Sequence, residues 1–362
     1  MSDISTLENI LSGIQPLNDT WVDRARKRTA QLLMPTRALG RLHDISEKIC
    51  GMQETITPDV TQKAILVMAG DHGVVAEGVS AYPQEVTGAM VETFLAGGAG
   101  INVLARYAGA DVWVVDAGII TDLSPKQLEN PDRLITHKMG PGTQNLSVGP
   151  ARSREQATRS ILVGFDVAKQ VIESGADMLG TGDMGIGNTT PSAAIGAVIT
   201  GAELDVMVGR GTGVDDAGLK RKRKAIRRGI ELNKPDPKDG LDVLAKVGGF
   251  EIGAIAGCIL AGAYYRKPVV VDGFISAAGA LIAHSMGPCS VDFMFAGHAS
   301  AEPGHQSMMK HLGLDPILNL GMRLGEGTGG AMAMMIIESA VRIFLDMATF
   351  EEAGVPGKNG SD

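Results

Sequence analysis

The sequence predicts an α/β protein built around a parallel sheet whose two faces are covered by helices. Short apolar runs alternate along the chain with longer segments of helical periodicity. The runs are continuously apolar, which is typical of parallel strands buried on both faces. Polar or glycine-rich segments follow these runs, and in an open α/β sheet ligands bind at such carboxyl ends. We therefore expect a ligand site along one edge of the sheet.

Six apolar runs are the predicted strands, at residues 64–69, 112–116, 177–180, 268–272, 291–296 and 317–321. One helix between them is well marked, because Ser153 and Gln156 form a capping box and Gly175 closes the end. Residues 253–263 are rich in Gly and Ala, so we expect a helix packed very closely on a neighbour, within one chain or between two. Residues 331–347 are predicted to form a long apolar helix.

The two ends of the chain stand apart from this alternation. Residues 1–56 look helical, with one polar side and no strand signal. We expect residues 1–56 and 331–350 to pair as a small helical domain beside an α/β catalytic domain of residues 57–330. Residues 234–240, Lys-Pro-Asp-Pro-Lys-Asp-Gly, indicate a linker or turn, and residues 351–362 a flexible polar tail.

Composition restricts the class of protein. A net charge of −8 argues against bulk nucleic-acid binding, which normally needs a basic domain. The three cysteines are widely spaced and form neither a disulfide framework nor a zinc signature. The first basic residue is Arg24, without the pattern of a signal peptide, and the apolar helix at 331–347 carries three charges at helical spacing. We expect a cytoplasmic protein that binds neither nucleic acid nor membrane.

The most informative segment is Arg-Leu-Gly-Glu-Gly-Thr-Gly-Gly at residues 323–330. A single carboxylate, Glu326, stands among four glycines between an apolar run and an apolar helix. Glycine allows close approach of the backbone to a ligand, and a lone buried Glu has a raised pKa that suits proton transfer near neutral pH. The alternative is a strand-to-helix turn whose Glu occupies the first helical turn for its dipole.

A second glycine-rich loop follows a predicted strand at residues 180–190, Gly-Thr-Gly-Asp-Met-Gly-Ile-Gly-Asn-Thr-Thr. Three of its glycines match the dinucleotide pattern G-x-G-x-x-G, with Glu203 about 20 residues further on. The pattern is not specific here, because the segment around Glu326 also matches it. Both loops contain a carboxylate, Asp183 or Glu326, that would repel a pyrophosphate. An oxidoreductase is therefore disfavoured.

A third loop, Gly-Arg-Gly-Thr-Gly at residues 209–213, precedes a basic helix at residues 220–228. Backbone N–H groups in such a turn can hold one phosphate, and a lysine adds charge. The basic residues point in several directions around a helix, and no aromatic residues lie between them. We expect most of them to be solvated, with one or two facing the loop to bind a phosphomonoester.

The loop after the first predicted strand has two noteworthy clusters. Asp71 and His72 are adjacent on a turn, so we expect them to order the loop rather than to act as an acid/base pair. Ser80, Tyr82 and Pro83 offer a flat, partly apolar surface that could stack on a ring, or they form a simple turn.

Two histidines, a serine and a glutamate occur together in the segment from His298 to His305. Neither H-E-x-x-H spacing nor a G-x-S-x-G elbow is present, so we predict no metal and no serine hydrolase. The chain also lacks a Walker A sequence and the paired-acid loop that grips pyrophosphate through magnesium in ordinary phosphoribosyltransferases.

Taken together, these loops resemble those of the nicotinate-nucleotide:dimethylbenzimidazole phosphoribosyltransferases, which make the lower-ligand nucleotide of cobamides. The resemblance covers roughly residues 17–347 and rests on seven blocks in the same order: 69–73 with 77–83, 115–118, 185–190, 209–213, 271–274, 300–305 and 324–328. It implies a Rossmann-like domain beside a small helical one, a homodimer, and no metal or other cofactor. The implied reaction transfers phosphoribose from nicotinate mononucleotide to 5,6-dimethylbenzimidazole, giving α-ribazole 5′-phosphate and nicotinate.

The resemblance also assigns site residues. Glu326 falls on the catalytic base of the family, and Lys222 on its phosphate-contacting lysine. Donor-binding positions are Gly185, Gly187, Asn188, Thr189, Gly211, Ser300 and Glu302, and positions around the acceptor base are Ser80, Tyr82, Pro83, Met184 and Leu324. One position departs from the family, which usually has Glu where this chain has Asp183. Because aspartate is one methylene shorter, its role as a supporting acid and the acceptor preference are both open.

Three other functions are compatible with glycine-rich loops at strand ends. An NAD-linked oxidoreductase would bind a dinucleotide and transfer hydride. A purine phosphoribosyltransferase or nucleoside phosphorylase would require a pyrophosphate donor with magnesium, or free phosphate. A non-catalytic nucleotide-binding protein would show affinity alone.

Overall fold

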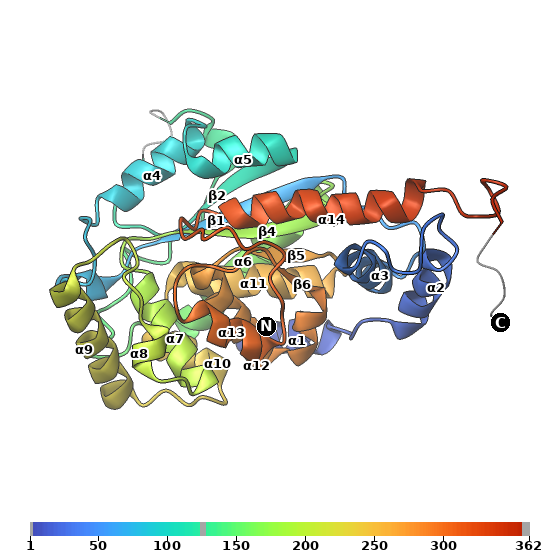
Figure 1. The fold of residues 1–362 in the computed structure, drawn as a ribbon. Helices are drawn as coiled ribbons and strands as arrows, with labels where there is room; N and C mark the ends of the chain where they lie inside the picture. Colours follow the sequence, from blue (N-terminus) through green and yellow to red (C-terminus); the bar gives the residue numbers. More distant parts are fainter. Residues whose placement is uncertain (1–2, 124–127, 357–362) are drawn as a thin grey trace.

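The computed structural model describes residues 3–123 and 128–356, which fold around one six-stranded parallel sheet (Figure 1). Its strands are β1 Lys63–Gly70, β2 Ala110–Gly118, β3 Leu134–Thr136, β4 Met178–Met184, β5 Val269–Val271 and β6 Met294–Ala296. The strand order is β3-β2-β1-β4-β5-β6, which is the Rossmann order. The predicted fold class is therefore confirmed. Strands β2 and β3 are added on one side of β1, and strands β4 to β6 on its other side. Folds of this type bind ligands at such a switch, here between β1 and β4.

Helices cover both faces of the sheet, as Figure 1 shows. On one face lie α6 Arg154–Glu173, α10 Gly240–Val247, α11 Phe250–Tyr264 and α12 Phe274–Met286. On the other lie α4 Val86–Leu95, α5 Gly100–Ala108 and α14 Thr328–Asp346. The other helices that the structure describes after β1 are α7 Thr189–Thr200, α8 Leu204–Met207, α9 Asp216–Asn233 and α13 His305–Leu312. The 3-10 turns are η1 Gly73–Glu77, η3 Pro131–Arg133 and η4 Pro288–Phe293.

Two predictions about helices are confirmed, the capping box at the start of α6 and the close packing of the Gly- and Ala-rich helix α11. The Ser153 hydroxyl accepts from the Gln156 N–H, and the Gln156 side chain accepts from the Ser153 N–H, so the capping box is present. The helices α6 and α11 approach so closely that a Cβ on Gly257 would lie 1.9 Å from the Ile161 carbonyl oxygen. The close packing of the Gly- and Ala-rich helix is thus made within the chain.

Two strand predictions differ from the structure. The predicted strand at 317–321 is wrong, because this segment runs past the end of β6 and only Leu318 forms an isolated bridge, with His298. The segment extends beyond the covered part of the sheet, and Leu320 is 58% exposed. Strand β3 was not predicted; it lies at the sheet edge and has two half-buried residues and one exposed residue.

The three N-terminal helices, α1 Asp3–Gly13, α2 Asp19–Thr29 and α3 Arg41–Gln53, do not all pack alike. Helices α2 and α3 pack on each other, and α14 runs past the sheet to reach α3 (Figure 1). The Arg28 guanidinium donates to the carbonyls of Phe344 and Leu345 at the end of α14. Helix α1 instead packs on α6 and α11. The division into two domains stays a prediction, and residues 357–362 of the predicted tail lie outside the described residues.

Two stretches of the described chain, Val86–Ala108 and Thr328–Asp346, are long and apolar enough to cross a membrane by composition alone. The first contains α4, α5 and the turn between them, where Gly97 has a φ of +78°. The second is α14, whose Glu338 pairs with the buried Lys63 of β1 at 2.8 Å. About half of each stretch is buried against the rest of the chain, as expected for core helices.

Candidate active site

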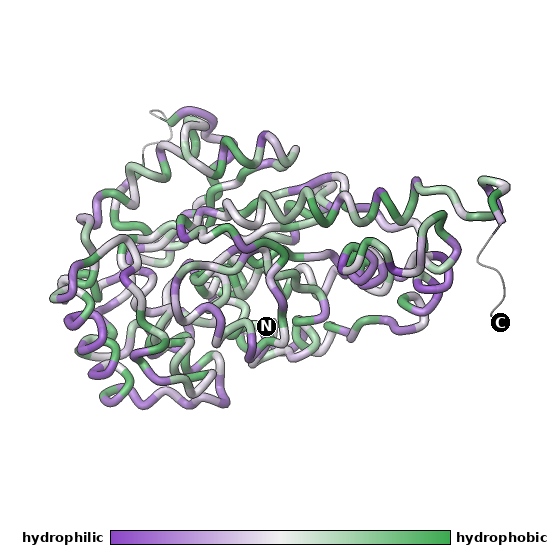
Figure 2. The backbone as a smooth tube through the Cα atoms, in the orientation of Figure 1, coloured by the Kyte–Doolittle hydropathy of each residue, from purple (hydrophilic) through white to green (hydrophobic). Residues whose placement is uncertain are grey.

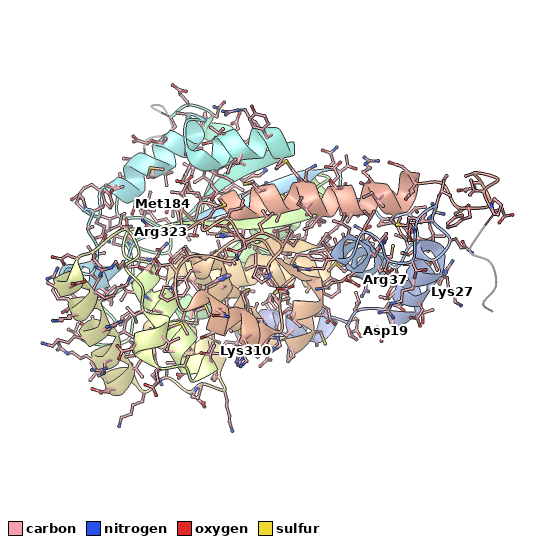
Figure 3. All side chains as sticks on the ribbon, in the orientation of Figure 1. Asp19, Lys27, Arg37, Met184, Lys310 and Arg323 are labelled. Atoms are coloured by element: carbon pink, nitrogen blue, oxygen red, sulfur yellow. The ribbon has the colours of Figure 1, made fainter. Side chains whose placement is uncertain are left out.

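A cavity of about 340 Å³ opens at the carboxyl ends of β4, β5 and β6. Predicted site residues that line it are Tyr82, Asp183, Asn188, Thr189, Gly211, Ser300, Glu302 and Leu324. They are joined there by residues without an earlier assignment, among them Thr212, Gly273, Phe274, Ile275, His298, Arg323 and Gly325. In Figure 3 the labels of Met184 and Arg323 mark the end of β4 and the loop that leads into α14.

The backbone at Glu326 is held in an unusual conformation. Its φ is +64°, between Gly325 at +81° and Gly327 at +93°, so three consecutive residues are left-handed. Glycine at position 182 allows this loop to lie directly on β4, because a Cβ there would be 2.4 Å from the Glu326 carbonyl oxygen. Gly182 and Gly327, one from each segment, therefore allow the close contact between the loop and the strand.

The Glu326 carboxylate is 6% exposed and lies beside the cavity wall formed by Gly325. Its Oε2 accepts a hydrogen bond from the backbone N–H of Ile101, in the first turn of α5, at 3.0 Å. Burial and the nearby Asp272 raise the pKa of Glu326, and the Ile101 hydrogen bond opposes that rise. The residue precedes α14 and faces the amino end of another helix, so the helix-dipole alternative does not hold for α14 itself.

Asp183 lines the cavity at the end of β4, and its Oδ2 accepts a hydrogen bond from the Asn188 amide at 2.9 Å. Burial, followed by the negative charge of Asp272, raises the pKa of Asp183 well above its usual value. These surroundings favour the neutral form of the carboxyl, and in that form it can donate a hydrogen bond as well as accept one.

Replacing Asp183 by Asn is expected to lower kcat by less than about tenfold, because the amide has the shape and hydrogen-bonding capacity of the neutral acid and one net hydrogen bond contributes about 1 kcal/mol. Steady-state kinetics at neutral pH measures the effect. A loss of a hundredfold or more would instead mean that Asp183 itself transfers a proton or acts as an anion. Asp183→Leu, which removes the polar group altogether, is the companion variant and is expected to be the more damaging of the two.

Lys222 is the buried cation of the site and lies on α9 behind the glycine loop at residues 209–213. Its Nζ donates to the Thr189 hydroxyl and, at 3.4 Å, to the Gly209 carbonyl. Burial lowers the pKa of Lys222 to about 8, and the neighbouring Glu302 partly offsets this. Gly211 has a φ of +53°, and a Cβ there would come within 3.1 Å of the Nζ. The lysine thus lies directly beneath the loop.

The other basic residues of α9 have different surroundings. Arg223 pairs with Asp205 at 3.2 Å, and Arg221 donates to the Gly78 carbonyl at 3.1 Å. Figure 2 colours many of the residues of α9 as hydrophilic, and the basic residues Lys220, Arg221, Lys224, Arg227 and Arg228 are exposed. A solvated helix with one lysine turned toward the loop is what the sequence predicted.

Four further residues predicted to bind the donor divide into two groups. Glu302 accepts from the Gly211 N–H at 3.1 Å, and the Ser300 hydroxyl accepts from the Glu302 N–H, so these two fix the loop over Lys222. Gly185 and Gly187 do not line the cavity; a Cβ at either would collide, with the Gly70 carbonyl and Val75 respectively. Their function in the structure is close packing of the loop after β4.

Two of the five predicted acceptor-base residues form the cavity rim. Tyr82 is 54% and Leu324 is 61% exposed, which leaves two large apolar surfaces at the opening. Ser80 accepts from the Tyr82 N–H at 3.2 Å and so orders this turn. Ser80, Pro83 and Met184 do not line the cavity itself.

Asp71 and His72 contact different partners, as expected for loop-ordering residues. The Asp71 Oδ2 accepts from the Ile120 N–H at 2.8 Å, and the His72 Nε2 lies 2.9 Å from the buried Glu251 Oε1. His298 and His305 stack on each other with ring centroids 6.3 Å apart. Among the described residues, no group of three or more His, Cys, Asp and Glu side chains is arranged to hold a metal ion.

Sequence reasoning missed Asp272, although its position directly after β5 was available as a signal. Its carboxylate is fully buried between β5 and the loop of Glu326. Arg323 was also unassigned. Its guanidinium donates to the Gly211 carbonyl at 3.0 Å and so joins the loop of Glu326 to the glycine loop at residues 209–213. Both contacts link segments more than 50 residues apart, which no local pattern reveals.

The fold and the site define an α/β enzyme. Lys222 and Glu326 do not line the cavity themselves: the lysine lies behind the lining residues Thr189 and Gly211, and the carboxylate adjoins the lining residue Gly325. The family model described as Phosphoribosyltransferase matches residues 14–355 of the chain. The nicotinate-nucleotide–dimethylbenzimidazole phosphoribosyltransferase of Desulforamulus reducens is 52% identical over 353 residues, covering 97% of this chain and 99% of that protein. The enzyme of the same name from Desulforudis audaxviator is 49% identical over 352 residues, covering 97% and 98%.

The crystal structure of the enzyme of this name from Thermus thermophilus superposes with a TM-score of 0.88 at 44% identity, covering 94% of this chain and all of that one. The chain therefore belongs to the nicotinate-nucleotide–dimethylbenzimidazole phosphoribosyltransferase family.

Proposed function

We propose that the protein transfers the 5-phosphoribosyl group of nicotinate mononucleotide to 5,6-dimethylbenzimidazole, giving α-ribazole 5′-phosphate and nicotinate for assembly of the cobalamin nucleotide loop. Membership of the family and the names of its relatives support this reaction. The observation that carries it is a cavity with a buried lysine behind its wall at Thr189 and Gly211 and a shielded carboxylate of raised pKa behind its wall at Gly325.

In this proposal the donor phosphate lies over Gly211 and Thr189, where the loop N–H groups and the Lys222 ammonium neutralise its charge. The acceptor ring lies against Leu324 and Tyr82, whose exposed apolar surfaces suit a flat aromatic base. This arrangement brings the acceptor over Gly325, next to Glu326. Asp183 lines the same cavity, and in its neutral form it donates a hydrogen bond there.

The bond between C1′ and the pyridinium nitrogen breaks, and its electron pair returns to nicotinate, which neutralises the ring cation. Departure therefore needs no general acid. One benzimidazole nitrogen attacks C1′ from the opposite face, so the β-nucleotide becomes an α-nucleotide. The other ring nitrogen loses its proton to the Glu326 carboxylate. Alignment of the two rings supplies much of the acceleration through orientation.

We further propose that the protein is a cytoplasmic homodimer that needs no metal or other cofactor. The family resemblance supports the dimer and the absence of a metal requirement. Light scattering after size-exclusion chromatography tests the dimer.

The function is tested by incubating the protein with nicotinate mononucleotide and 5,6-dimethylbenzimidazole, with and without EDTA. The expected product is α-ribazole 5′-phosphate in both samples, identified by NMR of the anomeric proton. A β-anomer would contradict inversion, and loss of product in EDTA would contradict a metal-free reaction. Hydride transfer with a dinucleotide, or turnover only with a pyrophosphate donor and magnesium, would favour the rival enzymes.

A further inference from the structure

Asp272, at the carboxyl end of β5, is a fully buried carboxylate that does not line the cavity. Its Oδ2 accepts from the Gly327 N–H at 3.1 Å, and its Oδ1 accepts from the Gly330 N–H at 2.8 Å. These two N–H groups lie on the chain immediately after Glu326 and in the first turn of α14. One carboxylate therefore binds the whole turn that carries the candidate base.

The turn needs such support because Glu326 is a non-glycine residue at positive φ. A left-handed conformation disfavours an L-residue by roughly 1–2 kcal/mol, and it persists only where the surroundings fix it. Gly182 makes room for the Glu326 carbonyl on one side. The paired hydrogen bonds to Asp272 hold the following peptide group on the other side.

Asp272 is in turn fixed from the β6 side. The His298 Nε2 lies 3.7 Å from its Oδ1, and the His298 ring packs so closely on Gly329 that a Cβ there would be 2.0 Å from the ring. His298 lines the cavity and stacks on His305, whose Nδ1 accepts from the Ser300 N–H at 3.3 Å. The Asp272 carboxylate thus lies between the loop of Glu326 and the segment that follows β6.

We propose that Asp272 is a positioning residue: it contacts no substrate, and its two hydrogen bonds to the turn after Glu326 aim the Glu326 carboxylate at the acceptor ring. This role rests on the proposed function, because it assigns the purpose of the turn to proton removal. The contact differs from ordinary helix capping because one of the two bound N–H groups, that of Gly327, directly follows the reacting residue.

The charge of Asp272 has a second effect on the same site. The titratable groups that face it are Asp183 from β4, Glu326 from the loop before α14, and His298 from the segment after β6. The carboxylate raises the pKa of both Glu326 and Asp183. Its removal lowers the pKa of Glu326, so the base stays ionised to lower pH.

Asp272→Asn keeps the size of the side chain but places an NH₂ group against one of the two N–H donors. We expect kcat to fall about 100-fold, the effect of a misplacement of roughly 1 Å, while KM for each substrate stays within about twofold. The acid limb of the kcat profile is expected to move to lower pH. A role confined to stability would leave that limb in place.

The matched control is Asp116→Asn. Asp116 is also a buried carboxylate at the end of a strand, and its Oδ1 accepts from the N–H groups of Gly118 and Ile119 at 3.0 and 2.9 Å. This variant removes comparable hydrogen bonds away from the cavity, so its stability should fall similarly while kcat and its pH profile stay near wild type. Equal losses of kcat in both variants, or an unchanged kcat in Asp272→Asn, overturn the proposal.

Amide hydrogen exchange separates this inference from the proposed reaction. In Asp272→Asn, exchange in peptides covering residues 325–330 is expected to accelerate at least tenfold, with no such change in Asp116→Asn. If the wild-type protein makes no α-ribazole phosphate, the proposed function fails and the exchange result alone judges whether Asp272 holds the turn. Unchanged exchange rejects the positioning role whichever reaction the protein catalyses.

Discussion

Glu326→Gln is expected to lower kcat by roughly 10²- to 10⁴-fold, the usual contribution of a general base, with smaller effects on the KM of either substrate. Glutamine preserves the shape of the side chain and can still accept the Ile101 hydrogen bond, so the loop should keep its conformation. The loss therefore reports the missing proton acceptor. Single-turnover kinetics measures it free of product release, and near-normal turnover would remove Glu326 from the mechanism.

The pH profile gives an independent check on the same residue. Burial and Asp272 raise the pKa of Glu326, and the base works only when ionised, so wild-type kcat should fall as pH decreases through that raised pKa. The acid limb is thus expected above the usual range of a glutamate. It should disappear in Glu326→Gln, whose residual rate no longer depends on this ionisation; an acid limb that survives in the variant would belong to another group.

Lys222→Met is expected to raise the KM for nicotinate mononucleotide by about 10- to 100-fold, because hydrogen bonds to charged groups contribute roughly 1.5–3 kcal/mol. Methionine fills the buried volume without the charge, so kcat at saturating donor should change much less. Initial rates at varied donor concentration separate the two effects. The exposed neighbour Lys224 is the control, and Lys224→Met should leave the donor KM near wild type.

The same lysine predicts how donor capture depends on pH. Its pKa is lowered to about 8, so the free protein carries the ammonium below that pH and loses it above. Wild-type kcat/KM for the donor is therefore expected to fall as pH rises through about 8, and this fall should be absent in Lys222→Met. An unchanged donor KM in the variant would place the phosphate elsewhere in the cavity.

Much of the fold was predictable because its signals are local. Continuous apolar runs identified five strands of the sheet, and the capping box at Ser153 marked the start of α6. The edge strand β3 has only three residues, two half-buried and one exposed, so it gives no such signal. Residues 317–321 gave a false one, because their apolar character comes from packing beside the end of β6 rather than from the sheet interior.

The candidate site was predictable in part for a similar reason. Glycines around Glu326 and before Lys222 mark close backbone approaches, and these are visible in the sequence. What the sequence does not show is which carboxylates meet. Asp183, Asp272 and Glu326 come from three separate segments, and the raised pKa of Asp183 depends on its burial and on their convergence in the fold. The partner of Glu326 on α5 lies 225 positions away along the chain, beyond any local pattern.

Because Glu326 has a left-handed conformation, the residue that best suits the backbone at this position differs from the residue that the proposed chemistry requires. Glycine would adopt this backbone angle without strain, yet the proposed mechanism requires the carboxylate of Glu326 to take the proton. A library of variants sorted for stable, well-folded protein would therefore become enriched in the residue that abolishes turnover. Attempts to make this enzyme more heat-resistant by consensus or stability scoring should keep position 326 fixed and seek their gains elsewhere.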